Sequence, residues 1–166
     1  MKSHGSIYVS AVLAALSGYF IYQWWFNPNR IIKQRLGDVA SALLAPASED
    51  DIARLARLAR LRGYLDEKIH VRIGRTADLS SRDDVVGAVA GWKTPTGGSD
   101  VAFVDVDVRV NSDDTARAFV TAEMTARDPQ SGQQTVDSRE VVFSLGKRKG
   151  GWLISEADVK DPPKPQ

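Results

Sequence analysis

The sequence begins with a long uncharged segment, which constrains the fold more than any other feature. No Asp, Glu, Lys or Arg occurs between residues 5 and 29, and residues 7–26 are the most apolar part of this segment. Those 20 residues would form a helix about 30 Å long, which matches the hydrocarbon thickness of a bilayer. We therefore expect residues 1–4 to form an N-terminal tail and residues 5–26 a single transmembrane helix.

Two further patterns within this segment support a membrane location and a helical partner. Aromatic residues at its end are typical of the headgroup level, and the candidate interface residues are Tyr22, Trp24, Trp25 and Phe26. Small residues that recur every four positions let a second helix approach closely. The candidate helix-packing residues are Ser10, Ala11, Ala14, Ala15 and Gly18. Such residues are also common in membrane helices without a partner, so this pattern has two interpretations.

A cleaved signal peptide is the alternative to an anchor. Lys2 supplies a basic start, and residues 15–17 (Ala-Leu-Ser) form a small-x-small cleavage pattern. The apolar run continues for about nine residues beyond that pattern, which favours an uncleaved anchor.

The charges that flank the segment bear on its orientation. Arg30, Lys33 and Arg35 follow it closely and would hold the rest of the chain inside the cell. A short N-terminal anchor before one soluble domain, however, commonly exports that domain. We expect a single-pass protein of a bacterial inner membrane, with the domain on the extracytoplasmic side.

Three helices and a short strand are predicted next. Asn27 before Pro28 is typical of a helix start, and the apolar spacing predicts a buried face that ends before Pro46. That face consists of Ile32, Leu36, Val39 and Leu43. A second helix is expected from a Ser48 cap to about residue 62, with Gly63 ending it. A strand at residues 69–73 precedes a third helix, which Ser81 caps.

Four strands with apolar residues at every second position complete the chain. They cover about residues 101–110, 116–127, 136–145 and 152–159, and turn-forming residues separate them. Consecutive strands with short turns pair antiparallel. The alternation changes phase in the first of these strands, which predicts a bulge near Phe103 and a curved sheet.

This order of elements, with Gly151-Trp152-Leu153-Ile154 after a charged turn, resembles the nuclear transport factor 2-like superfamily. That superfamily includes the polyketide-cyclase and ketosteroid-isomerase-like proteins. The resemblance covers residues 27–160 and implies an α+β fold, in which three helices pack on a curved, mainly antiparallel sheet to form a cone. Residues 161–166 are expected to form a Pro-rich tail.

Catalytic members of that superfamily place acidic, Tyr or His side chains inside the cone. The candidate pocket residues here are Tyr64, Asp66, His70 and Trp92. His70, however, alternates with Ile69 and Val71 and is expected to face solvent. The chain has no Cys, two His and none of the usual metal or phosphate motifs. We therefore predict no catalytic residue, no metal and no cofactor.

The charge pattern limits the partners. A net charge of +1 gives no reason to expect a nucleic acid. Two local basic groups are candidates for contact with a partner or with anionic lipid, and solvated surface is their alternative interpretation. They are Arg54, Arg57 and Arg60 in the second helix, and Lys147, Arg148 and Lys149 in a hairpin turn.

Taken together, these features predict a non-catalytic accessory or scaffold subunit. Its helix would pack against other membrane-protein subunits, and its cone domain would dock on a large, energy-transducing complex. The alternative is a membrane-tethered binding protein or isomerase-like enzyme for a small apolar ligand in the cone. A homodimer formed through the sheet is a third interpretation.

Overall fold

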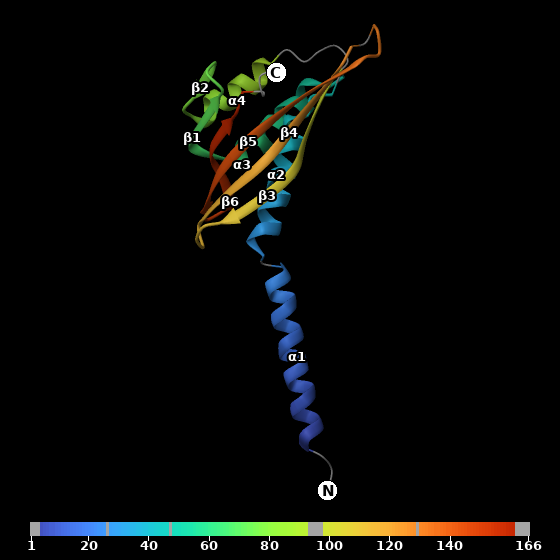
Figure 1. Cartoon of the computed structure of the whole chain (residues 1–166), viewed down its shortest axis with the longest axis vertical. Coiled ribbons are helices and arrows are strands. Elements are labelled where there is room, and N and C mark those ends of the chain that lie inside the picture. The colour runs from blue at the N-terminus through green and yellow to red at the C-terminus, as the bar shows by residue number, and fades with distance from the viewer. Residues whose placement is uncertain (1–3, 26, 47, 93–97, 129, 162–166) are drawn as a thin grey trace, which may run out of the picture.

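The computed structural model describes residues 4–25, 27–46, 48–92, 98–128 and 130–161. Its helices are α1 (His4–Trp25), α2 (Pro28–Leu43), α3 (Asp51–Tyr64) and α4 (Arg82–Gly91). Its strands are β1 (Leu65–Ile73), β2 (Ala77–Leu79), β3 (Ser99–Val110), β4 (Thr115–Arg127), β5 (Gln134–Arg148) and β6 (Gly151–Val159). Figure 1 shows α2, α3 and α4 against the sheet, and α1 extending away from it. The predicted α+β class is confirmed.

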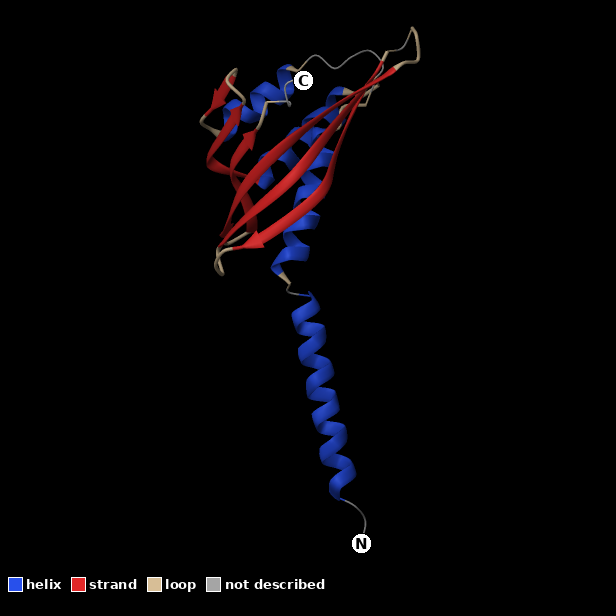
Figure 2. Ribbon diagram, in the orientation of Figure 1, coloured by secondary structure: helices blue, strands red, loops and turns tan. Residues whose placement is uncertain are grey.

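All six strands belong to one sheet, with the order β2-β1-β6-β5-β4-β3. Strands β3 to β6 form the predicted antiparallel meander, and Figure 2 shows their long, twisted course. Strand β1 pairs in parallel with β6, and the short β2 lies at the edge beside β1. The local pattern did not predict β2 or the parallel pair, because the partner of β1 lies at the far end of the chain.

Strand β3 contains the predicted bulge, slightly later than expected. Its register against β4 shifts between Val104 and Asp107, and Asp105 between them has a positive φ of 49°. As a result Phe103 lies opposite Ala122 while Val108 lies opposite Ala118, so both apolar residues face the same side of the sheet. A bulge bends its strand and increases the twist, which produces the predicted curvature.

Two of the three predicted helix starts are confirmed. The side chain of Asn27 accepts a hydrogen bond from the backbone N–H of Asn29 at 3.0 Å, immediately before Pro28. The hydroxyl of Ser81 accepts a hydrogen bond from the N–H of Asp84 at 3.1 Å. Both contacts satisfy an N–H that has no partner within its helix.

The bounds of α3 differ from the prediction at both ends. Asp50, not Ser48, caps its start, with Oδ1 accepting a hydrogen bond from Ala53 N at 2.7 Å. Gly63 does not end the helix, which continues to Tyr64. Strand β1 then begins at once with Leu65, which is buried and opposite Ile154 of β6. Long-range packing therefore sets this boundary.

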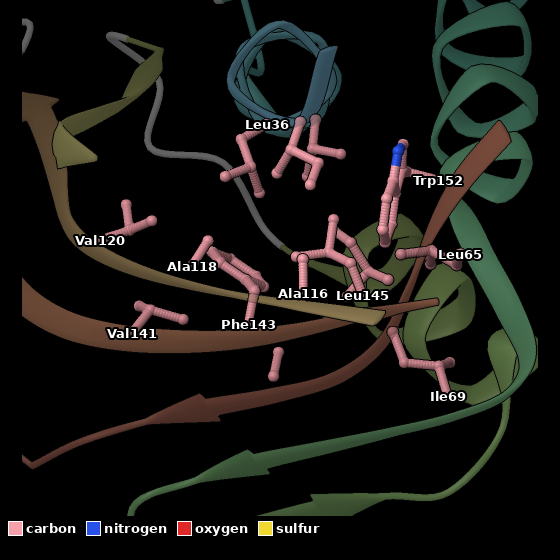
Figure 3. Packing of buried hydrophobic residues seen from close by; sticks show 14 of the residues in the cluster. Leu36, Leu65, Ile69, Ala116, Ala118, Val120, Val141, Phe143, Leu145 and Trp152 are labelled. Carbon is pink, nitrogen blue, oxygen red and sulfur yellow. The ribbon is translucent and has the colours of Figure 1, made fainter. Parts of the chain in front are cut away.

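The core lies between α2 and what we call the inner face of the sheet, the face that carries Ala118, Val141 and Phe143. Ile32 and Leu36 of α2 are fully buried, one helical turn apart. Figure 3 shows Leu36 on the side of α2 that faces these strands. The predicted apolar face of this helix is confirmed at Ile32, Leu36 and Val39, whereas Leu43 is half-buried.

Helix α1 is helical over 22 residues, and its side chains are described from Val12 to Tyr22. All of these side chains are exposed, including Leu13, Phe20 and Ile21. Within the part of the chain that the structure describes, no helix is long and apolar enough to cross a membrane, so the structure does not support the predicted span.

Candidate functional site

A cavity of about 540 Å³ lies between the inner face of the sheet, α2 and α4. This volume is within the range of pockets that hold small molecules. Its walls are almost entirely apolar. Helices contribute Val39, Leu43, Leu61, Val85, Ala88 and Val89, and strands contribute Leu65, Ile69, Val71, Ile73, Leu79, Val101, Phe103, Ala122, Met124, Val141, Phe143, Ile154, Ala157 and Val159.

The cavity exists because side chains fill the core at only one end of the sheet. At the filled end, Leu36 points from α2 toward the strands (Figure 3), and Leu36, Ala118 and Leu145 are all buried. At the other end, β4 presents the small Ala122 to the interior. Helix α4 covers this end through half-buried side chains such as Val85, and none of its described residues is fully buried.

Two charged residues of β5 face this cavity. Asp137 and Arg139 lie two and four residues before Val141, so the alternation of the strand places all three on the inner face. Arg139 lies opposite Ala122, and Asp137 lies opposite Met124. Arg139 Nε donates a hydrogen bond to Asp137 Oδ2 at 2.9 Å. Both side chains are half-buried, with 34% and 39% exposure for Arg139 and Asp137.

Sequence analysis missed these two residues, although the signal was present. The apolar residues Val141, Phe143 and Leu145 identify the inner face of β5, and the same alternation extends back to Arg139 and Asp137. The alternation identifies the face of the strand, but it does not indicate that this face lines a cavity at this position.

The four candidate pocket residues are not brought together. Trp92 lines the cavity and is 45% exposed. The ring of Tyr64 instead lies 4.9 Å from the guanidinium carbon of Arg35. Asp66 forms an ion pair with Arg148 at 3.3 Å. His70 lies outside the cavity lining, and its Nε2 is 2.9 Å from Asp78 Oδ1.

The three arginines of α3 that were predicted as a contact surface, Arg54, Arg57 and Arg60, do not share one exposed surface. Arg57 is buried. Its guanidinium forms a two-point ion pair with Glu49 and also donates from Nη1 to Ala42 O at 2.9 Å. Arg54 donates to the backbone oxygen of Ala90 in α4. Arg60 is exposed. The interpretation of Arg57 as a lipid or partner contact is therefore wrong, since its charge is used inside the domain.

The second basic group lies where strand β5 turns into β6. Lys147, Arg148 and Lys149 are exposed there. Arg148 forms an ion pair with Asp66, whereas Lys147 and Lys149 form none with the described residues. On strand β3, Asp105, Asp107 and Arg109 are also exposed, and Arg109 Nε pairs with Asp107 Oδ2 at 3.0 Å.

In the N-terminal helix, the described candidates for helix packing are all exposed: Ala14, Ala15 and Gly18. Tyr22 is 62% exposed. The side chains of Ser10, Ala11, Trp24 and Trp25, together with Phe26, lie outside the described residues.

Few polar or charged groups of the described residues line the cavity. Among the residues that the structure describes, no group of three or more His, Cys, Asp or Glu side chains is placed to hold a metal. The charged residues in the lining are Glu123, Asp137 and Arg139. Within the described chain, the pair of Asp137 and Arg139 therefore offers one acceptor and one donor group at the edge of an apolar space.

The fold is similar to those of solved proteins described as nuclear transport factor 2-like. A protein of this class with a cystatin-like fold, from Novosphingobium aromaticivorans, superposes with a TM-score of 0.69 at 12% identity, over 90% of this chain and 92% of the other. A scytalone dehydratase-like protein from the same species gives a TM-score of 0.66 at 13% identity, over 81% and 83%.

A superfamily protein from Salmonella enterica gives a TM-score of 0.64 at 14% identity, over 84% of this chain and 94% of the other. The sequence itself matches no protein-family model and no curated protein. At these identities the similarity defines the fold of the domain and leaves its activity to be argued from the site.

Proposed function

We propose that the domain is a non-catalytic binding module that holds a small apolar ligand in its cavity. The observation that supports this most directly is the space of about 540 Å³ beside the core, walled by Val, Leu, Ile and Phe side chains. Burying apolar surface in such a space contributes about 25 cal/mol per Å², and this is the driving force we expect for binding of a small apolar molecule.

Among the described residues, Asp137 is the acidic side chain on the inner wall of the cavity, and its hydrogen bond to Arg139 favours binding over catalysis. His70 and Tyr64, the other candidates for acid–base chemistry, are engaged with Asp78 and Arg35 away from the cavity lining. General acid–base catalysis needs such a group within hydrogen-bond reach of the substrate.

Binding of the neutral fluorophore N-phenyl-1-naphthylamine to the full-length protein tests this proposal. We expect saturable fluorescence enhancement by the wild type, and its loss in Ala122→Trp, because the indole would occupy the cavity. Thr121→Trp is the matched control, since its neighbouring position places the indole on the outer face. Equal binding by the wild type and Ala122→Trp, with both folded by circular dichroism, would contradict the proposal.

A second proposed role, an accessory subunit held at a bacterial inner membrane, is favoured by α1. Its described side chains include Val12 at 57% exposure, Leu13 at 59% and Ile21 at 59%, which lie on different sides of the helix. A helix that is apolar on all sides requires either lipid or a protein partner to cover it. In this role α1 would associate with other membrane-protein subunits, and the domain would dock on a larger complex on the extracytoplasmic side.

Native extraction of the tagged full-length protein in mild detergent tests this second role. Blue-native sizing and mass spectrometry of co-migrating proteins should show a stoichiometric large assembly. A lone monomer or dimer would contradict the accessory role and would leave the ligand-binding proposal unaffected.

A further inference from the structure

We propose that the ligand is an uncharged apolar molecule with one hydroxyl group, which Asp137 and Arg139 recognise together. This inference rests on the proposed ligand-binding function and identifies the chemical class of the ligand. It follows from the position of the ion pair, its unused hydrogen-bonding atoms and the charge of the cavity lining.

The position of the pair is unusual within this chain. The sequence Asp-x-Arg occurs twice on strands in the same arrangement, at residues 107–109 on β3 and at residues 137–139 on β5. The first pair lies on the outer face, where Asp107 and Arg109 are 58% and 67% exposed. The second pair lines the cavity and is half-buried. Placing charges against an apolar space costs free energy unless they are hydrogen-bonded, and the second pair is held by a single hydrogen bond between its two members.

The ion pair leaves hydrogen-bonding atoms of both residues unused. Arg139 Nε and Asp137 Oδ2 bind each other. Among the described residues, no other partner contacts Asp137 Oδ1 or the two Nη atoms of Arg139. A hydroxyl group both donates and accepts, so one hydroxyl can donate to Asp137 Oδ1 and accept from an Arg139 Nη.

The carboxylate of Asp137 disfavours an acid as the ligand. Asp137 and Arg139 are the charged lining residues on the inner face and their charges cancel, whereas Glu123 lies opposite Ser138, in the register of the outer face. A carboxylate at the hydroxyl position would gain from Arg139 but would be repelled by the carboxylate of Asp137, to which Arg139 is already bound. An uncharged hydroxyl avoids this repulsion.

Equilibrium dialysis of the full-length protein with naphthalene, 2-naphthol and 2-naphthoate tests the inference, because these probes share one ring system. We expect 2-naphthol to bind about tenfold more tightly than naphthalene, as hydrogen bonds to charged groups contribute about 1.5 kcal/mol or more. We expect 2-naphthoate to bind more weakly than 2-naphthol.

Paired double variants assign the preference to these residues. In Asp137→Leu/Arg139→Met, naphthalene should still bind, and the ratio of the dissociation constants of naphthalene and 2-naphthol should fall from about ten to about one. Replacing both members of an ion pair by apolar residues is often neutral for stability. Asp107→Leu/Arg109→Met is the matched control on the outer face, and it should retain the tenfold preference.

The outcomes separate the two proposals. Equal binding of naphthalene and 2-naphthol, tighter binding of 2-naphthoate, or a preference that survives in Asp137→Leu/Arg139→Met overturns the inference and leaves the ligand-binding function standing. No binding of any probe up to about millimolar concentration, where the binding free energy is only about 4 kcal/mol, overturns both.

Discussion

Arg57 donates from Nε to Glu49 Oε1 at 2.8 Å and from Nη2 to Glu49 Oε2 at 2.9 Å, so the two side chains form a bidentate ion pair. Only 8% of the Arg57 side chain and 12% of the Glu49 side chain are exposed. The remaining guanidinium nitrogen donates to Ala42 O near the C-terminal end of α2. One arginine therefore joins α3, the loop before it and α2.

Arg57→Ala should destabilise the domain by about 3 kcal/mol, because it leaves the carboxylate of Glu49 largely buried without its partner. Chemical denaturation measures this free energy of unfolding. Arg60→Ala, at an exposed position of the same helix, is the control and should change it by less than about 0.5 kcal/mol. Similar effects of the two substitutions would show that the ion pair does not support the fold.

The same pair predicts a dependence on pH. The hydrogen bond from Arg57 holds the pKa of Glu49 below its ordinary value of 4.5. The unfolded chain therefore binds a proton at Glu49 more readily than the folded chain does, and this contribution to stability is lost as pH falls below about 4.5.

Glu49→Gln isolates this contribution. At pH 7 the variant should be less stable than the wild type, and the difference should shrink as pH falls from about 5 towards 3. Denaturation at a series of pH values measures it. A difference that stays constant over this range would contradict the assignment to Glu49.

The bulge in β3 predicts a position-specific intolerance of branched side chains. Asp105 has φ of 49°, a left-handed conformation that a β-branched residue adopts only with strain. Asp105→Val should therefore destabilise the protein by about 1–2 kcal/mol. Asp107→Val, at the next outward-facing position in ordinary strand conformation, should be close to neutral. Thermal unfolding of the two variants compares them, and equal melting temperatures would contradict the role of the bulge.

Two leucines on different helices test where the core lies. Leu36 is fully buried, whereas Leu55 of α3 is 68% exposed and lies six residues before buried Leu61, about 120° away around the helix. Leu36→Ala should cost about 2–5 kcal/mol and Leu55→Ala less than about 0.5 kcal/mol. Urea denaturation measures both. A large cost at Leu55 would indicate that another chain covers α3.

Local sequence signals predicted much of the fold, for identifiable reasons. Asn27 with Pro28 and Ser81 start helices through contacts within four residues, so the local sequence is sufficient to identify them. The four strands of the meander follow period-two patterns separated by short turns. The cap at Ser48 was wrong because Asp50, two residues later, is an equally good acceptor, and the backbone path decides between them.

The sequence by itself determined the apolar stripe of α2, the alternation of the strands and the uncharged, apolar character of the first helix, because each depends on residue spacing along one element. Only the tertiary structure decided that Arg57 is buried, that Gly63 lies inside a helix, and that β1 pairs with β6. It also decided that Asp137 and Arg139 line a cavity. Whether a charged residue on an inner face is buried by core side chains or borders an open space depends on the elements that cover it. Here that element is α4, which lies far from β5 in the sequence and covers the open end of the sheet through half-buried side chains.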